Sequence, residues 1–502
     1  MSLLRKYGML LAILLFAMAA FAQDGKKITI ISADEARFDQ KSGTDARRLI
    51  GNVGFRHEDA FMYCDSAWFY ADQNSMDAFG HVRVEQGDSL LMTGRFMTYN
   101  GYTRMAKVRD SVVLVHKNSR LLTDSLNFDR SENFGYFFDG GKVLNDDIEM
   151  TSTEGYYYPD TKDYYAKYDV ELVHPDYTIF ADTLKYNTER KITTFLGPTH
   201  IINDSSRIRC TSGWYDTQNE LSAFGENTTI YQKSQTIKAD SIFYNRKTGD
   251  GRAWKNVHLL DTAENFAGSG NYAEYNDKKE TSLITDSALV MYYEDEDTTY
   301  IHGDTVFLLS DSLGARIVHA YYKVQIFKSD FQGRCDSLTY SESDSITRMY
   351  YDPILWAEDS QITADTIELF MKNNKADRIN MLDKSLIVMK EDSIRFSQIS
   401  GNNMIATMKN NELSRIYVPE NARTIYYVKD EKTEDIIGVN KENSREMTIF
   451  RKDGAIREIK FIGKPEGSLL PDDQTVPDDL RLKGFRWLNH LRPLVVADLF
   501  IW

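Results

Sequence analysis

The sequence predicts an all-β protein: a repetitive antiparallel β-jellyroll, stacked from bent hairpin units of about 29 residues. Three observations predict it. One short phrase recurs at nearly constant spacing through most of the 502 residues. Each copy alternates apolar and other residues with the period of two that a half-buried strand requires. The chain also holds 30 Tyr and 26 Phe but only 9 Pro, which favours strands over disorder.

The recurring phrase is an aliphatic residue, a gap, a small residue, an Asp, and apolar residues two and four places after the Asp. Clear copies place the Asp at Asp34, Asp65, Asp124, Asp182, Asp240, Asp336 and Asp365. Weaker copies place Arg95, Glu154, Thr211 and Asn271 there, with Tyr99, Tyr158, Tyr215 and Tyr275 at the aromatic place. From Asp34 to Asn271 the steps are 31, 30, 29, 30, 28, 29, 29 and 31 residues. A spacing this regular indicates a repeated structural unit.

A second phrase lies between the Asp phrases and leads into Gly-x-Val, as in Gly51-Asn52-Val53. Polar turn clusters separate the two phrases, so each unit is a pair of arms in a zigzag of antiparallel hairpins. Around the Asp, positions −3 and −1 share one strand face and positions +2 and +4 share the other, yet all four are apolar or small. We therefore expect the inward face to switch at the Asp, where the arm bends or bulges. Bent arms in every layer would form a trough with an apolar interior.

The first residues predict export. Arg5 and Lys6 precede an apolar run over residues 9–21, and Ala20-Phe21-Ala22 has the small-x-small pattern of a signal peptidase site. We expect residues 1–22 to be a cleavable signal peptide. The alternative is an uncleaved anchor, although a membrane span needs roughly 20 apolar residues. The expected location is the periplasm of a two-membrane bacterium, with association with the outer membrane left open.

The remaining chain divides by its repeat quality. We expect regular jellyroll repeats over 23–290 and further, less regular repeats over 291–465, because an acidic stretch at 294–297 interrupts the rhythm. Residues 466–502 are predicted to be a tail, because prolines there would interrupt strand pairing. The tail also carries many apolar residues, which are unfavourable in water unless they dock. It would either cap the last hairpin or bind a partner.

Charge narrows the classes of partner. The chain has 60 basic and 75 acidic residues, a net charge of −15, which becomes −17 when Arg5 and Lys6 leave with the signal peptide. This balance argues against nucleic acid, whose phosphates require a basic face. It also argues against simple electrostatic adhesion to anionic membranes.

The residues that could carry chemistry favour a structural interpretation. The Asp recurs in every layer, whereas a catalytic site needs one special place, so we expect it to satisfy backbone donors at the bend. Cys64, Cys210 and Cys335 all occupy the small −1 position, so we expect small core residues and no disulfide. The nine histidines are scattered, and no phosphate loop, nucleophile elbow or zinc signature is present. We predict a non-enzymatic protein with no catalytic residues, no cofactor and no metal.

The motifs that carry a resemblance are Ala33-Asp34-x-Ala36-x-Phe38 followed by Gly51-Asn52-Val53, and the Asp65 phrase followed by Gly80-His81-Val82. They resemble the OstA-like family, which includes the lipopolysaccharide transport proteins LptA, LptC and the N-terminal domain of LptD. The likeness covers residues 28–290 well and 300–430 loosely. It implies a twisted β-jellyroll whose groove holds lipopolysaccharide acyl chains, and edge-to-edge joining with other jellyrolls of the transport machinery. The chain is much longer than a single bridge module and lacks the large C-terminal barrel of LptD.

This resemblance leads to a specific hypothesis. The chain would be a periplasmic bridge that moves lipopolysaccharide from the inner to the outer membrane, binding the lipid A acyl chains by apolar area. Side chains at +2 and +4 would line the groove: Ala67, Phe69, Leu126, Phe128, Leu184, Tyr186, Ile242 and Tyr244. Tight core packing without room for a ligand is the alternative, since aromatic stripes usually mean core. Two rival functions also stay open: a parallel β-helix that binds or cleaves polysaccharide, and a structural surface repeat with outward aromatic side chains.

Overall fold

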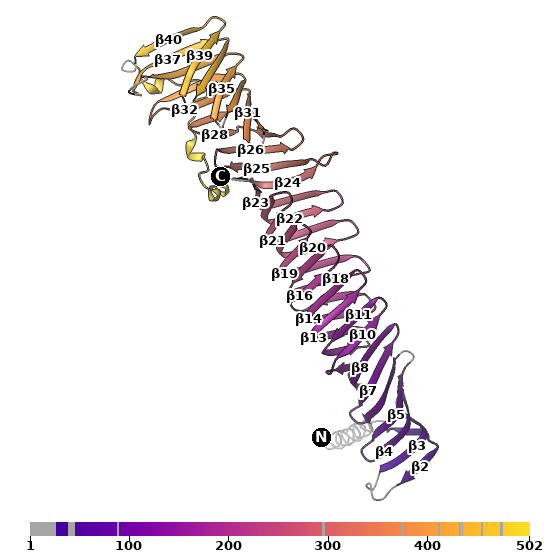
Figure 1. Cartoon of the computed structure of the whole chain (residues 1–502). Helices are drawn as coiled ribbons and strands as arrows, with labels where there is room; N and C mark the ends of the chain where they lie inside the picture. Colours follow the sequence, from indigo (N-terminus) through magenta and orange to yellow (C-terminus); the bar gives the residue numbers. More distant parts are fainter. Residues whose placement is uncertain are drawn as a thin grey trace, which may run out of the picture. The chain divides into compact units, whose positions relative to one another are not determined.

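The computed structural model describes residues 27–38, 46–87, 90–293, 297–372, 375–409, 412–430, 433, 435–452, 455–471 and 475–502 (Figure 1). The predicted signal peptide lies outside these residues. The chain forms two compact units, unit 1 (Met1–Thr228) and unit 2 (Thr229–Trp502), whereas the sequence suggested a change of regularity near residue 290. Among the described residues, no helix has the length and apolar character of a membrane span.

Unit 1 is a stack of antiparallel arms, and each arm, whether it is one long strand or two short ones, is hydrogen-bonded to the arms before and after it. Its strands are β1 (Thr29–Ser32), β2 (Glu35–Phe38), β3 (Ala46–His57), β4 (Ala60–Tyr70), β5 (Ser75–Gln86), β6 (Leu90–Asn100), β7 (Met105–His116), β8 (Ser119–Asp129), β9 (Phe134–Phe137), β10 (Gly141–Asn145), β11 (Ile148–Ser152), β12 (Glu154–Tyr158), β13 (Asp163–His174), β14 (Tyr177–Asn187), β15 (Ile192–Phe195), β16 (Thr199–Ile202), β17 (Ser206–Cys210) and β18 (Ser212–Asp216). The next strand, β19 (Leu221–Gln232), spans the boundary between the units.

Every long arm of unit 1 is bent near its middle, so the stack has two wings. In β3, Val53–His57 pairs with Ala60–Cys64 of β4 in the first wing, and Ala46–Ile50 pairs with Ser66–Tyr70 in the second wing. The pairing skips Gly51 and Asn52, which both have positive φ. Some arms are interrupted at the bend: β8 pairs with β10 in the first wing and with β9 in the second. The two wings enclose one hydrophobic core.

The bend confirms the expected switch of the inward face. In β4, Met62 and Cys64 are buried before the bend, whereas Ala67 and Phe69 are buried after it. Residues two apart stay on one side of a strand, so a change from even to odd positions requires the bulge that the register shift records. The structure thus confirms the all-β, repetitive antiparallel jellyroll of bent hairpins.

One repeat assignment is wrong by a single residue. The sequence placed Glu154 at the Asp position and Tyr158 at the aromatic position, but the buried side chain is Tyr157. Thr153 therefore stands at the bend, where its N–H donates to the Tyr168 carbonyl. This correction makes the steps on both sides of it 29 residues, so the repeat is more regular than the sequence pattern suggested.

Unit 2 begins with long bent arms and then separates into two sheets. Its strands are β20 (Gln235–Asn245), β21 (Asp250–Asp261), β22 (Phe266–Asn276), β23 (Thr281–Tyr293), β24 (Thr298–Ser310), β25 (Arg316–Phe327), β26 (Phe331–Ser341), β27 (Ile346–Tyr350), β28 (Ile354–Ala357), β29 (Ser360–Thr363), β30 (Thr366–Lys372), β31 (Lys375–Leu382), β32 (Ser385–Lys390), β33 (Phe396–Gly401), β34 (Met404–Lys409), β35 (Glu412–Val418), β36 (Ala422–Lys429), β37 (Ile436–Ser444), β38 (Glu446–Lys452), β39 (Ala455–Ile462) and β40 (Glu466–Pro471). Short 3-10 turns follow: η3 (Pro477–Asp479), η4 (Asn489–Leu491) and η5 (Val496–Phe500).

The separation begins at β26, whose first half pairs with β28 and whose second half pairs with β27. The first sheet of unit 2 then continues through β29, β32, β33, β36, β37 and β40. The second sheet continues through β30, β31, β34, β35, β38 and β39. The main core of unit 2 takes side chains from both sheets, such as Ile387 from β32 and Ile416 from β35.

Residues 480–502, which we call the docked tail, lie first on the other face of the first sheet and then against β24, β25 and β26. Leu480 and Leu482 are buried against side chains of β32, β33, β36 and β37, and Phe485 and Trp487 pack on the same cluster. Two buried glutamines bind the tail backbone. Gln398 Nε2 donates to the Leu480 carbonyl (2.9 Å) and Gln398 Oε1 accepts from Leu482 N (2.8 Å).

Gln361 repeats this arrangement one step further along the tail. Its Nε2 donates to the Arg486 carbonyl (2.7 Å), and its Oε1 accepts from Leu488 N (2.6 Å). Gln325 Nε2 donates to the carbonyls of Leu499 and Ile501. The tail therefore lies on a sheet face, where buried side-chain amides satisfy its backbone groups. The first residues of the predicted tail, Glu466–Pro471, instead form the paired strand β40.

All strand pairs given for the described residues of both units are antiparallel, as between β13 and β14. Antiparallel ladders exclude a parallel β-helix for this part of the chain, because a β-helix pairs equivalent strands in parallel. Except for the exposed Phe38 of the first layer, the aromatic residues at the +4 position of unit 1 point inward, as the buried Tyr99 and Phe128 do. That orientation is opposite to the one expected of a surface repeat that displays its aromatic side chains.

Candidate functional site

The side chains predicted to line the groove lie in the interior. Seven of the eight are buried, with exposed fractions no higher than the 7% of Phe69. Tyr244 is half-buried, and its hydroxyl donates to Asp277 Oδ2 (2.6 Å). Six of them belong to the core of unit 1: Ala67, Phe69, Leu126, Phe128, Leu184 and Tyr186. The other two, Ile242 and Tyr244, belong to unit 2. Their contact with acyl chains stays a prediction.

The interior of unit 1 is closed on two sides by different means. On the side of the bends, continuous backbone joins the wings. On the opposite side the turns of the two wings face each other. The first rim consists of the turns after β3, β5, β7 and β10, and the second rim consists of the turns after β4, β6, β8, β12 and β14. Side chains bridge these rims, and we call the line of contact the seam.

Hydrogen bonds form the inner layer of the seam. His57 Nδ1 lies 2.7 Å from the Tyr99 hydroxyl, and His116 Nδ1 bonds to the Tyr157 hydroxyl in the same way. One layer further, the Tyr186 hydroxyl donates to Asn145 Oδ1 (2.9 Å). The histidines and Asn145 end strands of the first wing, whereas the tyrosines belong to the second wing. Each bond therefore joins the two rims.

Ion pairs form the outer layer of the seam. Arg104 Nη2 lies 2.7 Å from Glu58 Oε1, Arg130 Nη2 lies 2.6 Å from Asp59 Oδ1, and Lys191 Nζ lies 2.9 Å from Asp146 Oδ2. In these three pairs the cation is on the second rim and the carboxylate on the first. A fourth, longer pair has the opposite polarity: Lys117 Nζ lies 3.9 Å from Glu189 Oε1.

Arg130 connects the two layers. Its guanidinium side chain is 4% exposed and donates to the Tyr99 hydroxyl (2.8 Å) and to Gln86 Oε1 (3.2 Å) as well as to Asp59. Burial raises the pKa of Tyr99, and the charge of Arg130 opposes that rise. Because a buried guanidinium is stabilised only when its donors are satisfied, Arg130 holds the two rims together at this layer.

The sequence contains a signal for the seam, a polar residue that recurs at the repeat spacing. His57, Gln86, His116, Asn145 and His174 recur at intervals of 29 or 30 residues. They form a polar column at the last position of successive first-wing strands. The histidines were interpreted as scattered because the column mixes His, Gln and Asn. Aligning the repeats by position, without regard to residue type, would have revealed it.

The recurring Asp lies at the bend and points away from the interior. Asp34 Oδ2 accepts from Asn52 Nδ2 (2.9 Å), and Asp65 Oδ2 lies 2.8 Å from His81 Nδ1. Asn52 and His81 both have positive φ and are the second residue of the bulged pair in the next arm. The carboxylates thus bind side chains across the bend, where backbone donors had been expected, and their role there is structural.

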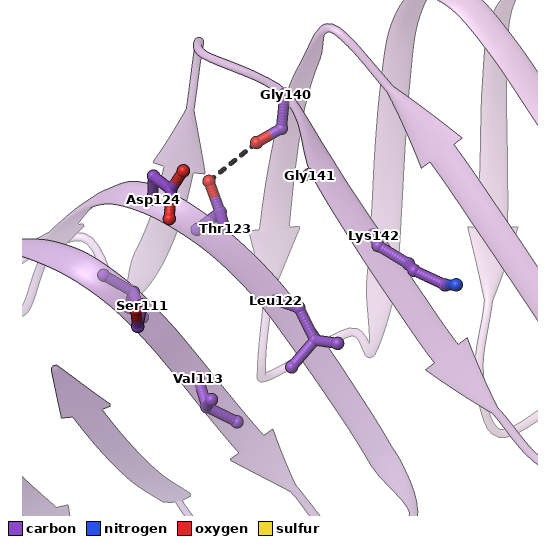
Figure 2. Close-up of a pocket in the computed structure, with 9 residues that line it drawn as sticks. Ser111, Val113, Leu122, Thr123, Asp124, Gly140, Gly141 and Lys142 are labelled. Carbon is purple, nitrogen blue, oxygen red and sulfur yellow. Dashed lines mark hydrogen bonds between the residues drawn. The ribbon is translucent and has the colours of Figure 1, made fainter.

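A cavity of unit 1 also lies at a bend (Figure 2). It measures about 440 Å³ and is open to solvent, between β7, β8 and β10. Asp124, Gly141 and Lys142 belong to its lining, and the Thr123 hydroxyl donates to the Gly140 carbonyl (2.7 Å) at its edge. The cavity is outside the apolar interior and contains no set of residues typical of a catalytic site.

Within the described part of the chain, no group of three or more His, Cys, Asp or Glu residues could hold a metal ion. Cys64, Cys210 and Cys335 are buried free cysteines, and this burial confirms their predicted place as small core residues. Burial raises the pKa of the Cys64 thiol to about 11, so this thiol is un-ionised at neutral pH and behaves as a small core side chain.

Residues 25–182 match the family described as OstA-like protein. This part of unit 1 is similar to the OstA-like family. The matching segment, which we call the OstA-like segment, runs from β1 into β14 and includes most of the bends and most of the seam. It also includes most of the buried apolar side chains that succeed one another along the interior of unit 1, which we call the interior column. A solved structure similar to the chain is LptH from Pseudomonas aeruginosa, described as the LptA homologous periplasmic component of the conserved lipopolysaccharide transport device. The identity is 14%, the match covers 34% of this chain and 80% of that chain, and the TM-score is 0.13. No match was found among curated proteins.

Proposed function

We propose that this chain binds the acyl chains of lipopolysaccharide in the interior of unit 1 and acts as a periplasmic bridge toward the outer membrane. The observation that carries the proposal is the match of residues 25–182 to the OstA-like family together with the apolar interior of that segment, which includes Phe69, Leu126 and Phe128. An acyl chain is bound by the apolar area it removes from water, about 25 cal/mol per Å². A long column of apolar side chains fits such a ligand better than a polar one.

Joining to other jellyrolls would use the first strands of unit 1. β1 and β2 pair with β3 on one side, and their residues are mostly exposed. Ile31 and Phe38 are 46% and 58% exposed. A strand with an unpaired edge can be continued by the sheet of another protein. We therefore place the partner, a jellyroll component of the transport machinery, at this edge. The function proposed is transport without catalysis.

Photo-crosslinking tests the lipid-binding part. A photoreactive phenylalanine analogue at Phe69 or Phe128 should capture lipopolysaccharide in cells, because both rings belong to the interior column. The matched control is the same analogue at Tyr102, an aromatic residue of unit 1 that is 58% exposed. Labelling at Phe69 and Phe128 no stronger than at Tyr102 would overturn the proposal and leave a packed structural core.

A further inference from the structure

The seam is the side of unit 1 where the interior can be opened at the lowest cost. On the bend side, opening the interior would break backbone ladders between strands. On the seam side, the described contacts are side-chain hydrogen bonds and ion pairs, such as His116 with Tyr157 and Arg104 with Glu58. Partly exposed ion pairs contribute little free energy each, and they can be broken without disturbing any strand pairing.

An acyl chain can enter the interior through the seam only if the two rims separate. Tyr99, Phe128 and Tyr186 are at most 2% exposed, and two of these side chains bind directly to the opposite rim. A closed interior at the density of a protein core has no room for an added chain. Spreading of the two rims would expose the apolar column and at the same time separate the carboxylates from the cations.

The polarity of the seam indicates what could replace those carboxylates. Arg104, Arg130 and Lys191 lie on the second rim, and each has a carboxylate of the first rim as its partner. When the rims part, these cations stay in a row along the mouth of the interior. Phosphate groups are acceptors for which arginine forms strong, often bidentate hydrogen bonds. A lipid with acyl chains and phosphates would place its acyl chains in the apolar interior and its phosphates against the cations at the mouth.

We propose that the seam is a lateral gate for an acylated lipid with an anionic phosphate headgroup. In the closed state the rim cations pair with Glu58, Asp59 and Asp146. In the open state these cations bind the phosphates while the acyl chains enter between the wings. The inference rests on the proposed function, because it specifies how the ligand reaches the interior of unit 1. It adds that the ion pairs hold the gate closed and that the phosphates compete with the carboxylates.

The first test separates the two sides of the seam. One variant neutralises the acidic side (Asp59→Asn with Asp146→Asn), and another neutralises the basic side (Arg104→Met with Lys191→Met). The control is Lys142→Met, whose ion pair with Glu149 joins two neighbouring strands of the first wing and does not cross the seam. Each protein also carries the photoreactive residue at Phe69. Each is mixed with detergent-dispersed diphosphoryl lipid A or with the same lipid after dephosphorylation, and the rate of labelling is measured.

Both seam variants should take up lipid faster than the control, by about fivefold for each lost ion pair that contributes about 1 kcal/mol, or about 25-fold for the two pairs lost in each variant. Only the basic-side variant should lose the preference for the phosphorylated lipid. A swapped pair, Asp146→Lys with Lys191→Asp, should return the rate to that of the unmodified protein, which excludes general destabilisation as the cause. Equal rates in all proteins, or an unchanged phosphate preference in the basic-side variant, would overturn the gate.

Hydrogen exchange tests the gate without lipid. The acidic-side variant should exchange faster at backbone amides of the rims, such as residues 114–121, with no change at the bends. Unchanged exchange at the rims would contradict a gate held by these pairs. The failures can also be told apart. If Phe69 labels in the unmodified protein but no seam variant changes the rate, the gate alone is wrong. If no protein labels with either lipid, the proposed function is wrong and the gate falls with it.

Discussion

Arg95 and Asp110 form an ion pair at a bend of unit 1, with the cation at the place that the recurring Asp occupies in the two adjacent layers. Arg95 Nη1 lies 3.6 Å from Asp110 Oδ2. Arg95 occupies the Asp position of its arm, and Asp110 has a φ of 66° in the bulged pair of the next arm. In the preceding layer Asp65 binds His81, the second residue of its bulged pair, whereas Asp110 is the first residue of its pair. The bend therefore requires complementary partners more than it requires an Asp.

Exchanging one partner should cost stability, and exchanging both should restore it. Arg95→Asp places two carboxylates against each other and should lower the free energy of unfolding by about 0.5–1 kcal/mol, because the pair is exposed. Adding Asp110→Arg restores an ion pair with its two charges exchanged and should recover the loss. Urea unfolding measures both variants. A double variant no more stable than Arg95→Asp would contradict this account of the bend.

Gly80 should tolerate alanine poorly because of Asp65. Gly80 has a φ of +71°, and a Cβ there would lie 2.3 Å from Asp65 Oδ2. Gly140 has a φ of +87° with open space around it, so Gly140→Ala measures the backbone cost alone, about 1 kcal/mol. Gly80→Ala should cost about 1–2 kcal/mol more, and Asp65→Ala in the same chain should remove that excess. Equal losses for Gly80→Ala and Gly140→Ala in urea unfolding would show that the carboxylate is not the obstacle.

Tyr164 and Tyr157 stack with ring centroids 4.1 Å apart but should respond oppositely to loss of the hydroxyl. The Tyr164 hydroxyl is buried with no hydrogen-bond partner among the described residues, and burial holds the pKa of Tyr164 well above its usual value. Tyr164→Phe should therefore leave stability unchanged or raise it by about 1 kcal/mol. Tyr157→Phe leaves His116 without its partner and should lower stability by about 1–2 kcal/mol. Thermal melts that order the two variants the other way would refute this comparison.

Acid should weaken unit 1 through His116. Burial lowers the pKa of His116 below its ordinary value of 6.5, and Lys117 and Lys162 lower it further while Asp160 opposes them. The unfolded chain therefore binds a proton near pH 6.5 that the folded chain does not. The full stability is present above pH 6.5 and is lost as the pH falls through the folded pKa.

His116→Asn is the matched variant for this prediction, because Asn145 occupies the same place in the next repeat and bonds to Tyr186. The variant should keep a bond across the seam and lose part of the decrease in urea stability between pH 7.5 and 5.5. An unchanged decrease would assign the pH dependence to other groups. The remaining part of the decrease includes His302 of unit 2, whose pKa burial also lowers.

The docked tail should detach when its glutamine contacts are removed. Gln361→Leu with Gln398→Leu deletes four hydrogen bonds to the tail backbone and leaves buried backbone groups unsatisfied, each at a cost of about 1–3 kcal/mol. Limited proteolysis should then cleave within residues 480–502 faster than in the unmodified protein. Gln218→Leu, a glutamine of unit 1, is the control. Equal cleavage rates would mean that apolar packing alone holds the tail.

The bends and the interior column could be predicted from the sequence because they depend on local alternation. Met62, Cys64, Ala67 and Phe69 carry the face switch in four nearby residues. A pattern of this kind needs no knowledge of distant partners. The wrong assignment of Glu154 has the same origin. The local residue pattern fits the repeat phrase when it is shifted by one residue, and the burial of Tyr157 shows which of the two registers is correct.

The seam and the docking of the tail could not be predicted in the same way, because both depend on contacts between distant residues. His57 meets Tyr99 42 residues away, and Gln398 meets Leu480 82 residues away. Neither pairing follows from strand periodicity. The tail was expected to cap an edge or to bind a partner, yet it lies on a sheet face. The sequence shows that the apolar residues there need a surface, but it does not identify which surface.

The docked tail also determines when unit 2 can be finished during synthesis. In unit 1 each strand binds one made shortly before it, as β4 binds β3, so layers can form as the chain elongates from its N-terminus. In unit 2, the partner of Gln325 is Leu499, which is synthesised 174 residues later. Until then the outer face of the first sheet, including Val388 and Tyr427, is bare. Transiently exposed apolar surface promotes aggregation of nascent chains, so this face is where a holding chaperone would be needed.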